Sequence, residues 1–261
     1  MKIFAVSDIH SFFTVFHGEL KKKGFEENNP DHLLVVCGDL FDRGPETLQL
    51  IDYINSLENI VLVRGNHEDL METMWERGYP KSHDISNGTL RTANDILYEH
   101  DSNCLVDEPM TLIKEILSPI FNRMVDYFET DNFIFVHGWI PMKYDTNKPF
   151  AEYSDPTLFD ENWREGDWSQ ARWFNGMKMA RRGIIVPGKT IVCGHWHCSW
   201  GWHIDSIKTD HCVSEFGESA IWEPYYTEGA CAIDRCTVHT NQCNILVLED
   251  KLLDESICAD A

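Results

Sequence analysis

Short apolar runs recur along the chain, and each ends abruptly in a residue whose side chain can bind a metal. Five such runs occupy residues 3–6, 33–37, 60–63, 133–136 and 190–193. They are rich in β-branched residues and lack strict alternation of apolar and polar positions, as expected of strands buried on both faces. The pattern therefore predicts five buried strands.

Helical patterns lie between these runs. Residues 46–57 carry apolar side chains at helical spacing and follow Pro45, a residue type favoured where a helix begins. Residues 70–75 and 110–128 also fit a helix. Alternating strands and helices predict an α/β protein with a largely parallel sheet covered on both faces. Ligands of such sheets bind beyond the carboxyl ends of the strands, so we expect all the runs to deliver polar residues to one edge of one sheet.

The polar residues that follow the runs are of metal-binding types. They are Asp8, His10, Asp39, Asn66, His67, His137, His195 and His197. Carboxylates, imidazoles and an amide together suit divalent manganese, iron or zinc better than calcium, which prefers oxygen ligands alone. The set is too large for one tetrahedral zinc ion and suits two ions about 3.5–4 Å apart. One carboxylate would then bridge the ions, and Asp39, at the end of a central strand, is the best placed.

The composition describes one globular domain. The chain has 261 residues, of which 43% are hydrophobic, and α/β chains of this length commonly form a single core. We therefore expect one domain over residues 1–261. The apolar segment at residues 3–6 is too short for a signal peptide, and no later stretch reaches the ~20 apolar residues of a membrane span. These features predict a soluble, cytoplasmic protein.

The net charge limits the partners. The chain carries 43 Asp or Glu residues and 22 Lys or Arg residues, which gives a net charge of −21 at pH 7. Such a surface repels nucleic-acid backbones and anionic membranes, so we expect neither as a stable partner. Phosphate substrates would also be repelled unless local cations reverse the field, and two divalent metal ions would do so.

The cysteines do not form the pattern of a disulfide framework. There are nine, an odd number, without regular spacing. Cys231, Cys236 and Cys243 could be read as a zinc cluster, but no paired C-x-x-C is present. Reduced thiols in a cytosol are the better interpretation.

Five segments resemble the motifs of the calcineurin-like metallophosphoesterases and follow one another in the order of that family. They are Asp8-Ile9-His10, Gly38-Asp39-Leu40-Phe41-Asp42-Arg43-Gly44, Gly65-Asn66-His67-Glu68, Val136-His137-Gly138 and Gly194-His195-Trp196-His197. The second and third resemble the phosphoprotein phosphatase branch, which contains the serine/threonine phosphatases. The resemblance implies a four-layer α/β/β/α sandwich with the active site at the strand carboxyl ends. It also implies two divalent transition-metal ions, with manganese expected first and iron or zinc as alternatives.

The resemblance implies which residues would hold each ion. The first ion would take Asp8, His10 and Asp39, and the second would take Asp39, Asn66, His137 and His195. His197 matches a histidine that joins the first ion in the wider family and is commonly absent from the phosphatase branch. It is therefore either a ligand or a hydrogen-bond partner of the ligands.

The resemblance implies catalytic roles for three further side chains. A hydroxide that bridges the metals would attack the phosphorus, and His67 would protonate the leaving oxygen while Asp42 orients its imidazole. Arg43 would bind two phosphate oxygens with its planar guanidinium. A second substrate-binding arginine usually lies between the last two histidine motifs of the branch, where Arg172 is the candidate and Arg164 the alternative.

Three regions lie outside the motifs. Residues 78–130 match nothing beyond helices and are interpreted as a helical insertion that covers the site. Residues 230–234 and 244–249 fit strands joined by a turn at 237–241, which predicts a β-hairpin within about 224–250 that completes a second sheet. Tryptophans gather around the last motif, where they are either core residues or walls of the pocket. These are Trp196, Trp200 and Trp202.

Three functions are compatible with these features. The favoured one is a phosphomonoesterase of the serine/threonine protein phosphatase type, acting on a phosphoprotein or a small phosphoester. The alternative is a dinucleoside polyphosphate hydrolase resembling the symmetrical diadenosine tetraphosphatases, which tend to lack an acid at the position of Asp42 and to have Asp at that of Glu68. A scaffold that has lost catalysis is disfavoured, because all the expected ligands and His67 are present.

Overall fold

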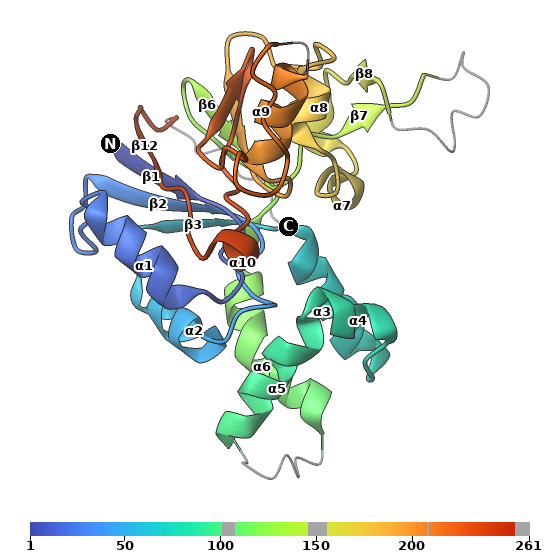
Figure 1. The fold of residues 1–261 in the computed structure, drawn as a ribbon. Coiled ribbons are helices and arrows are strands. Elements are labelled where there is room, and N and C mark those ends of the chain that lie inside the picture. Colours follow the sequence, from blue (N-terminus) through green and yellow to red (C-terminus); the bar gives the residue numbers. More distant parts are fainter. Residues whose placement is uncertain (101–107, 146–155, 208, 254–261) are drawn as a thin grey trace.

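The computed structural model describes residues 1–100, 108–145, 156–207 and 209–253. Its strands form two five-stranded sheets that pack face to face, with helices on the outer face of each (Figure 1). This is the four-layer α/β/β/α sandwich that the sequence predicts. Among the described residues, no helix combines the length and the hydrophobicity needed to cross a bilayer.

The first sheet contains the first three predicted strands. Its order is β12 (Leu246–Glu249), β1 (Lys2–Val6), β2 (His32–Cys37), β3 (Ile60–Val63) and β4 (Met124–Val125). Strands β1 to β4 are parallel neighbours, and β12 runs antiparallel to β1. The helices below it in Figure 1 are α1 (Phe13–Lys22), α2 (Thr47–Ser56), α3 (Asn66–Arg77), α4 (Ser82–Asn87), α5 (Thr89–His100) and α6 (Pro109–Phe121).

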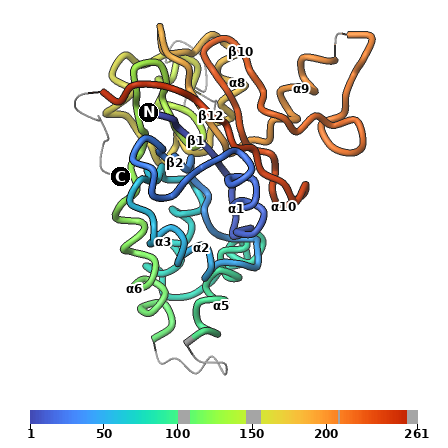
Figure 2. The backbone as a smooth tube through the Cα atoms, turned by 90° about the vertical axis from the view of Figure 1, so that its left-hand side faces the viewer, coloured from blue at the N-terminus to red at the C-terminus, as the bar shows by residue number. Residues whose placement is uncertain are grey.

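The second sheet contains the last two predicted strands. Its order is β10 (Tyr225–Thr227), β11 (Ala230–Ala232), β9 (Thr190–Cys193), β6 (Phe133–Phe135) and β5 (Phe128–Glu129). The elements on its outer side are a 3₁₀ turn (Trp163–Glu165), α7 (Trp168–Ala171), α8 (Gly176–Ala180), α9 (Cys198–Ser206) and the small strands β7 (Met142–Lys143) and β8 (Leu158–Phe159). Figure 2 shows α8 and α9 on the side of the strands opposite α1 and α2.

The expectation that all five runs end at one edge of one sheet is wrong. Strands β1, β2 and β3 belong to the first sheet, and β6 and β9 belong to the second. The chain changes sheet between β4 and β5. A strand buried on both faces has the same apolar pattern in either sheet, so the sequence pattern does not reveal the change. The carboxyl ends of both sets of strands nevertheless meet at one cavity, described below.

The C-terminal hairpin predicted for about 224–250 is also wrong. Strand β11 pairs with β10 and β9 in the second sheet, whereas β12 pairs with β1 in the first, with Lys2 opposite Glu249. The predicted turn is a short helix, α10 (Thr237–Thr240), on the path between the sheets. The hairpin that does form turns at Gly229, whose φ of +69° suits a tight turn.

Helices occupy much of the predicted insertion at 78–130. Within it, α4 contacts α5, and α5 and α6 pack against each other below the first sheet (Figure 1). The helix predicted for 110–128 ends at Phe121, because residues 124–125 add a strand to the first sheet and 128–129 add one to the second.

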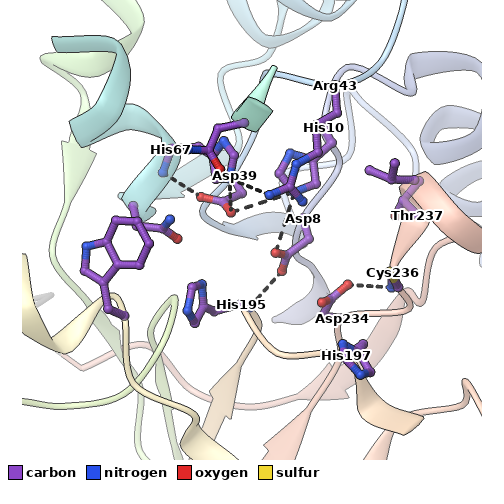
Figure 3. Close-up of a pocket in the computed structure, with 14 residues that line it drawn as sticks. Asp8, His10, Asp39, Arg43, His67, His195, His197, Asp234, Cys236 and Thr237 are labelled. Carbon is purple, nitrogen blue, oxygen red and sulfur yellow. Dashed lines mark hydrogen bonds and ion pairs between the residues drawn. The ribbon is translucent and has the colours of Figure 1, made fainter. Parts of the chain in front are cut away.

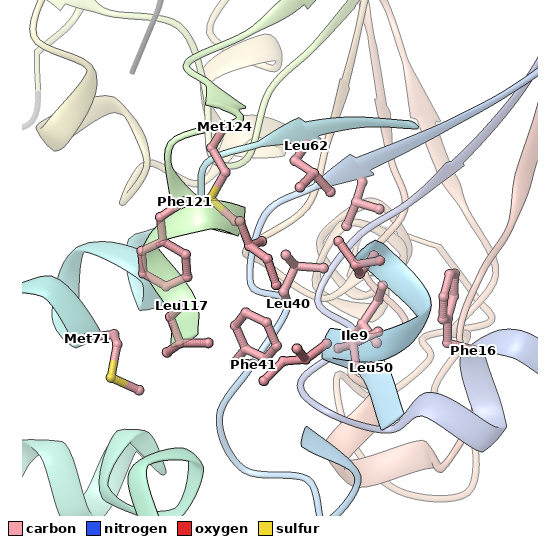
Figure 4. Packing of buried hydrophobic residues seen from close by; sticks show 14 of the residues in the cluster. Ile9, Phe16, Leu40, Phe41, Leu50, Leu62, Met71, Leu117, Phe121 and Met124 are labelled. Carbon is pink, nitrogen blue, oxygen red and sulfur yellow. The ribbon is translucent and has the colours of Figure 1, made fainter. Parts of the chain in front are cut away.

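Alternate side chains of each buried strand enter different cores. In β1, Phe4 and Val6 belong to the core between the first sheet and its helices. Phe16 and Leu50 belong to the same core (Figure 4). The intervening residues of β1 enter the core between the two sheets. Full burial of one such side chain contributes about 1.5–3 kcal/mol, so both faces of the strand are firmly held. The loops that follow the strands therefore project from rigid supports.

Candidate metal centre

The polar residues that follow the strands converge on a cavity of about 170 Å³ (Figure 3). Its lining residues are Asp8, His10, Asp39, Arg43, Asn66, His67, Asn87, Trp173, His195, His197, Asp234, Cys236, Thr237 and Val238. His137 and Asp42, which do not line it, contact residues that do: His137 Nε2 lies 2.8 Å from Asn66 Oδ1, and Asp42 contacts His67. The sequence thus located most of the cavity.

The backbone is left-handed at several of these residues. The φ angles are +52° at Asp8, +50° at His10, +54° at Asp39 and +64° at His195. Non-glycine residues rarely adopt this conformation, which costs about 1–3 kcal/mol and tends to persist at functional sites. Here it turns the chain sharply at the strand ends, so that the side chains face the cavity.

Asp39 lies between two groups of potential ligands. One group is Asp39 with His10 and His67, and the other is Asp39 with His137 and His195; within each, the ligand atoms lie within 4.8 Å of one another. The Nε2 atoms of His137 and His10 are 3.3 and 3.8 Å from the two different oxygens of Asp39. Asp8 is close to the first group, with Oδ1 4.0 Å from His10 Nε2.

The protonation preferences of the cluster suit bound cations. Burial raises the pKa of Asp39 well above its usual value, and nearby His67 opposes this shift. For His10 the shift is in the other direction: burial lowers the pKa, and Arg43 lowers it further, so the neutral imidazole is favoured. A buried carboxylate that needs compensation and a neutral imidazole are what a divalent ion binds.

Backbone carbonyls orient two of the imidazoles. His10 donates from Nδ1 to Phe41 O at 2.9 Å, and His137 donates from Nδ1 to Cys37 O at 2.8 Å. Each ring then presents Nε2 toward Asp39. Metal-binding histidines are commonly held in this way, because the hydrogen bond fixes both the tautomer and the ring orientation.

Glu68 joins the two loops that carry Asp39 and Asn66. Its carboxylate accepts hydrogen bonds from the N–H groups of Asp39 (3.1 Å), Leu40 (3.0 Å) and Gly65 (2.8 Å). Gly65 allows this approach, since a Cβ there would lie 2.3 Å from Asp39 Oδ1. The Gly-Asn-His-Glu segment therefore holds the two loops together, in addition to bringing candidate ligands to the cavity.

His67, Asp42 and Arg43 form a connected group at one side of the cavity. His67 Nδ1 donates to Asp42 Oδ2 at 2.6 Å, and an Arg43 N–H donates to His67 Nε2 at 2.8 Å. Burial opposes protonation of His67, but Asp39 and Asp42 outweigh it and raise the pKa of this histidine. An imidazole with a raised pKa can retain a proton for transfer to a leaving group.

The structure does not bring the other two predicted arginines to the cavity. Arg172 donates to Asp69 at 2.9 Å and also to Asp126, and Arg164 donates to both oxygens of Glu129. Neither is among the lining residues. The acidic partners of both arginines lie at distant positions in the sequence, which the interval between the last two histidine motifs does not reveal.

His197 lines the cavity away from both ligand groups. Its Nε2 is 2.9 Å from Glu215 Oε1, and its ring packs against Phe216. Figure 3 shows it beside Asp234, on the far side of Asp8 from Asp39. In the described residues neither ligand group includes His197.

Several lining residues were missed by the sequence analysis. Asp234 had a usable signal, because it follows the apolar residues of β11 as the predicted ligands follow their strands. Burial raises the pKa of Asp234, and the neighbouring carboxylate of Asp8 adds to the shift. Asn87 ends α4, and Trp173 sits between helices; neither had a pattern that could have identified it.

The alternative of a cysteine zinc cluster gains no support. Cys231, Cys236 and Cys243 are free thiols, and Cys231 is buried between the sheets. In the part of the chain that the structure describes, no group of three close ligand atoms includes any of them.

Comparisons with known proteins agree with this geometry. The family model described as calcineurin-like phosphoesterase matches residues 1–199. A symmetrical bis(5'-nucleosyl)-tetraphosphatase of Buchnera aphidicola subsp. Schizaphis graminum is 41% identical over 69 residues, which cover 26% of this chain and 24% of that protein. An asymmetrical bis(5'-nucleosyl)-tetraphosphatase of Geobacillus sp. is 40% identical over 76 residues, covering 26% of this chain and 31% of that protein. The chain thus matches about a quarter to a third of the length of these relatives.

Solved structures support the fold. A cold-active protein-tyrosine phosphatase of a psychrophilic Shewanella sp. superposes with a TM-score of 0.51 at 15% identity, covering 95% of this chain and 75% of that one. At this identity the likeness concerns the fold alone.

Proposed function

Because the chain belongs to the calcineurin-like phosphoesterase family, we propose that it hydrolyses phosphate esters at a centre where Asp39 and the residues around it would hold two divalent cations. The observation that carries the proposal is the position of Asp39, whose two oxygens each face a different histidine group. A single carboxylate shared in this way suits a pair of ions.

Each half of the centre has its own donor set. Asp8, His10 and Asp39 would hold the first ion, and Asp39, Asn66, His137 and His195 would hold the second. Mixed oxygen and nitrogen donors suit manganese, iron or zinc. His197 is a weaker candidate, because Glu215 already pairs with its ring.

The residues beside the centre can move a proton and grip the substrate. When bound, two divalent cations would supply Lewis acidity to the phosphoryl group and acidify a water nucleophile. His67, held by Asp42, would take up a proton at Nε2 in place of the hydrogen bond from Arg43 and donate it to the leaving oxygen. Arg43, with a guanidinium that reaches both His10 and His67, would bind phosphate oxygens between them.

Two substrate classes remain, and the observations favour nucleotides. The curated relatives are named as bis(5'-nucleosyl)-tetraphosphatases. The second substrate-binding arginine that the resemblance to the phosphatase branch implies is absent from the cavity, since Arg172 is held by Asp69 and Asp126. A phosphomonoesterase stays the second candidate, because the Asp42–His67 pair suits a poor leaving group such as a protein serine.

The metal content and the substrate ranking test this proposal. We expect about two transition-metal ions per chain after dialysis, and loss of both from Asp39→Asn because it serves both sites. Asp52→Asn, on the exposed face of α2, is the matched control. Trace metal content after Mn²⁺ addition would overturn the two-ion centre.

The ranking is measured under identical Mn²⁺ with diadenosine tetraphosphate and a phosphothreonine peptide. We expect the dinucleotide to have the higher kcat/KM. If kcat/KM is tenfold higher for the peptide, the substrate is a phosphoprotein rather than a nucleotide. The proposal of a two-ion hydrolase would still hold.

A further inference from the structure

A second cavity adjoins the metal centre. It has a volume of about 300 Å³ and is lined by Trp173, Phe174, Asn175, Lys178, Met179, Trp196 and Trp200. Trp173 lines this cavity and the metal cavity alike, so the two spaces share a wall. The family motifs explain His195 and His197, but they assign no task to these aromatic residues.

The walls of the cavity are indole rings on rigid supports. Trp196 follows His195 and packs edge to face on Trp200 of α9, with ring centroids 6.3 Å apart and an angle of 70° between the ring planes. Both are partly buried against the core of the second sheet. The floor is apolar, since Met179 is 1% and Phe174 9% exposed.

Trp173 stands at the border between the cavities. It is 48% exposed, a large fraction for a tryptophan, and its ring centroid is 5.8 Å from that of His195. An indole exposed beside a catalytic centre is well suited to contact a ligand, because it offers a wide apolar face at little cost in conformational entropy.

We propose that this tryptophan-lined cavity binds the nucleobase of a substrate whose phosphate chain extends into the metal cavity. The inference rests on the proposed hydrolase and adds the group that it recognises. The volume is at the lower end of small-ligand pockets, which suits one base better than a larger group. Nucleobases stack on aromatic side chains regardless of sequence, because every base has a π-face.

The charge of the protein favours recognition by stacking. With a net charge of −21, the surface as a whole repels a polyphosphate, so binding energy has to come from local contacts. A neutral base on indole rings avoids this repulsion. Lys178 adds a cation to the wall, and Asn175 adds an amide whose Oδ1 accepts a hydrogen bond from the Lys178 N–H at 2.9 Å.

Binding of adenosine to the metal-loaded protein tests the subsite. Adenosine has a base and no phosphate, so its binding requires neither turnover nor the phosphate grip. Trp196→Leu and Trp200→Leu keep apolar bulk but remove the ring. We expect each to raise the dissociation constant of adenosine about 5- to 100-fold, measured by calorimetry. Trp202→Leu is the matched control: it lies on the same helix and packs against Tyr225 outside the cavity. Thermal unfolding midpoints would show that all three variants fold.

The substrate preference provides the second readout. For Trp196→Leu, we expect kcat/KM for diadenosine tetraphosphate to fall at least about fivefold more than kcat/KM for glycerol 2-phosphate, which has no ring. The subsite is overturned if adenosine does not bind, or if it binds equally to the wild type and to both cavity variants. This holds even if the protein hydrolyses phosphoesters. If O-phosphotyrosine binds in a way that depends on the tryptophan rings and adenosine does not bind, the occupant of the cavity is a tyrosine ring rather than a nucleobase. Ring-dependent binding of adenosine by a protein without hydrolase activity would support the subsite and overturn the proposed function.

Discussion

The Nδ1 atom of His67 lies 2.6 Å from Oδ2 of Asp42, and two threonines of α5 hold the same carboxylate. Thr89 and Thr92 donate to Asp42 at 2.8 and 3.0 Å, and the Asp42 N–H donates back to Thr92 at 2.9 Å. The helical region between β3 and β4 therefore contributes directly to the orientation of the proposed acid. Thr89 and Thr92 lie within the predicted insertion at 78–130, so this region supports a side chain beside the cavity.

The leaving group reveals the role of His67. We expect His67→Asn to slow hydrolysis of alkyl phosphates by ~10²–10⁴-fold and of p-nitrophenyl phosphate much less, because a good leaving group needs little protonation. Steady-state rates on the two substrates measure the difference. Equal losses on both would mean that His67 serves metal binding or structure instead.

The threonines of α5 should act through His67. Replacement of both Thr89 and Thr92 by Val keeps their shape but removes two donors to a buried carboxylate, and we expect a loss of roughly tenfold in kcat with alkyl phosphates. The loss of kcat should be smaller with p-nitrophenyl phosphate than with alkyl phosphates. A merely structural defect would lower kcat equally for both substrates. Thr73→Val, at an exposed position of α3, is the control and should change neither rate.

Arg172 and Arg43 should affect different properties. Arg172→Ala leaves Asp126 without its partner, and burial already raises the pKa of Asp126 against the opposing effect of Arg172. We expect the free energy of unfolding to fall by about 3 kcal/mol, the cost of breaking a buried ion pair. Urea unfolding measures this change. A stable Arg172→Ala protein with a raised KM would restore Arg172 as a phosphate ligand.

Arg43 is an exposed residue, and Arg43→Ala should instead raise KM and lower kcat with little change in stability.

Asp250 should give the protein a stability that depends on pH. Burial alone would raise the pKa of Asp250, but hydrogen bonds from Thr130 and Asn132 outweigh it and lower the pKa. A lowered pKa in the folded state stabilises the protein above the unfolded value of about 3.9, and this contribution is lost as the pH falls through the folded value. Asp250→Asn should therefore cost about 1–3 kcal/mol at pH 7 and progressively less below pH ~4. Urea unfolding at several pH values checks this; a cost that is constant with pH would contradict it.

The sequence predicted which residues follow the strands and gather at the cavity, because their signal is local. Asp8, Asp39 and His137 stand directly after apolar runs, and a buried strand that ends in such a residue is recognisable without knowing its neighbours. The five strands were confirmed for the same reason, whereas their division between two sheets followed only from the family resemblance.

The errors concern contacts between distant segments. Arg172 is 46 residues from Asp126 and 103 from Asp69, so no local pattern reveals that these acids hold it. Strand β12 pairs with β1 at the other end of the chain, although its apolar residues suit either sheet. Trp173 lines two cavities that segments distant in the sequence form together, so no local pattern marks it.

The division of the ligands between the two sheets has a consequence for the lifetime of the protein. Asp39 follows β2 of the first sheet, whereas His137 and His195 follow β6 and β9 of the second. An ion held by these three residues would fasten one sheet to the other, as a crosslink does. By mass action, an ion present at a hundred times its dissociation constant stabilises the folded state by about 2.7 kcal/mol. Metal scarcity would then do more than stop turnover: it would loosen the sandwich and expose the chain to proteolysis, so that the abundance of the protein follows the supply of its metal.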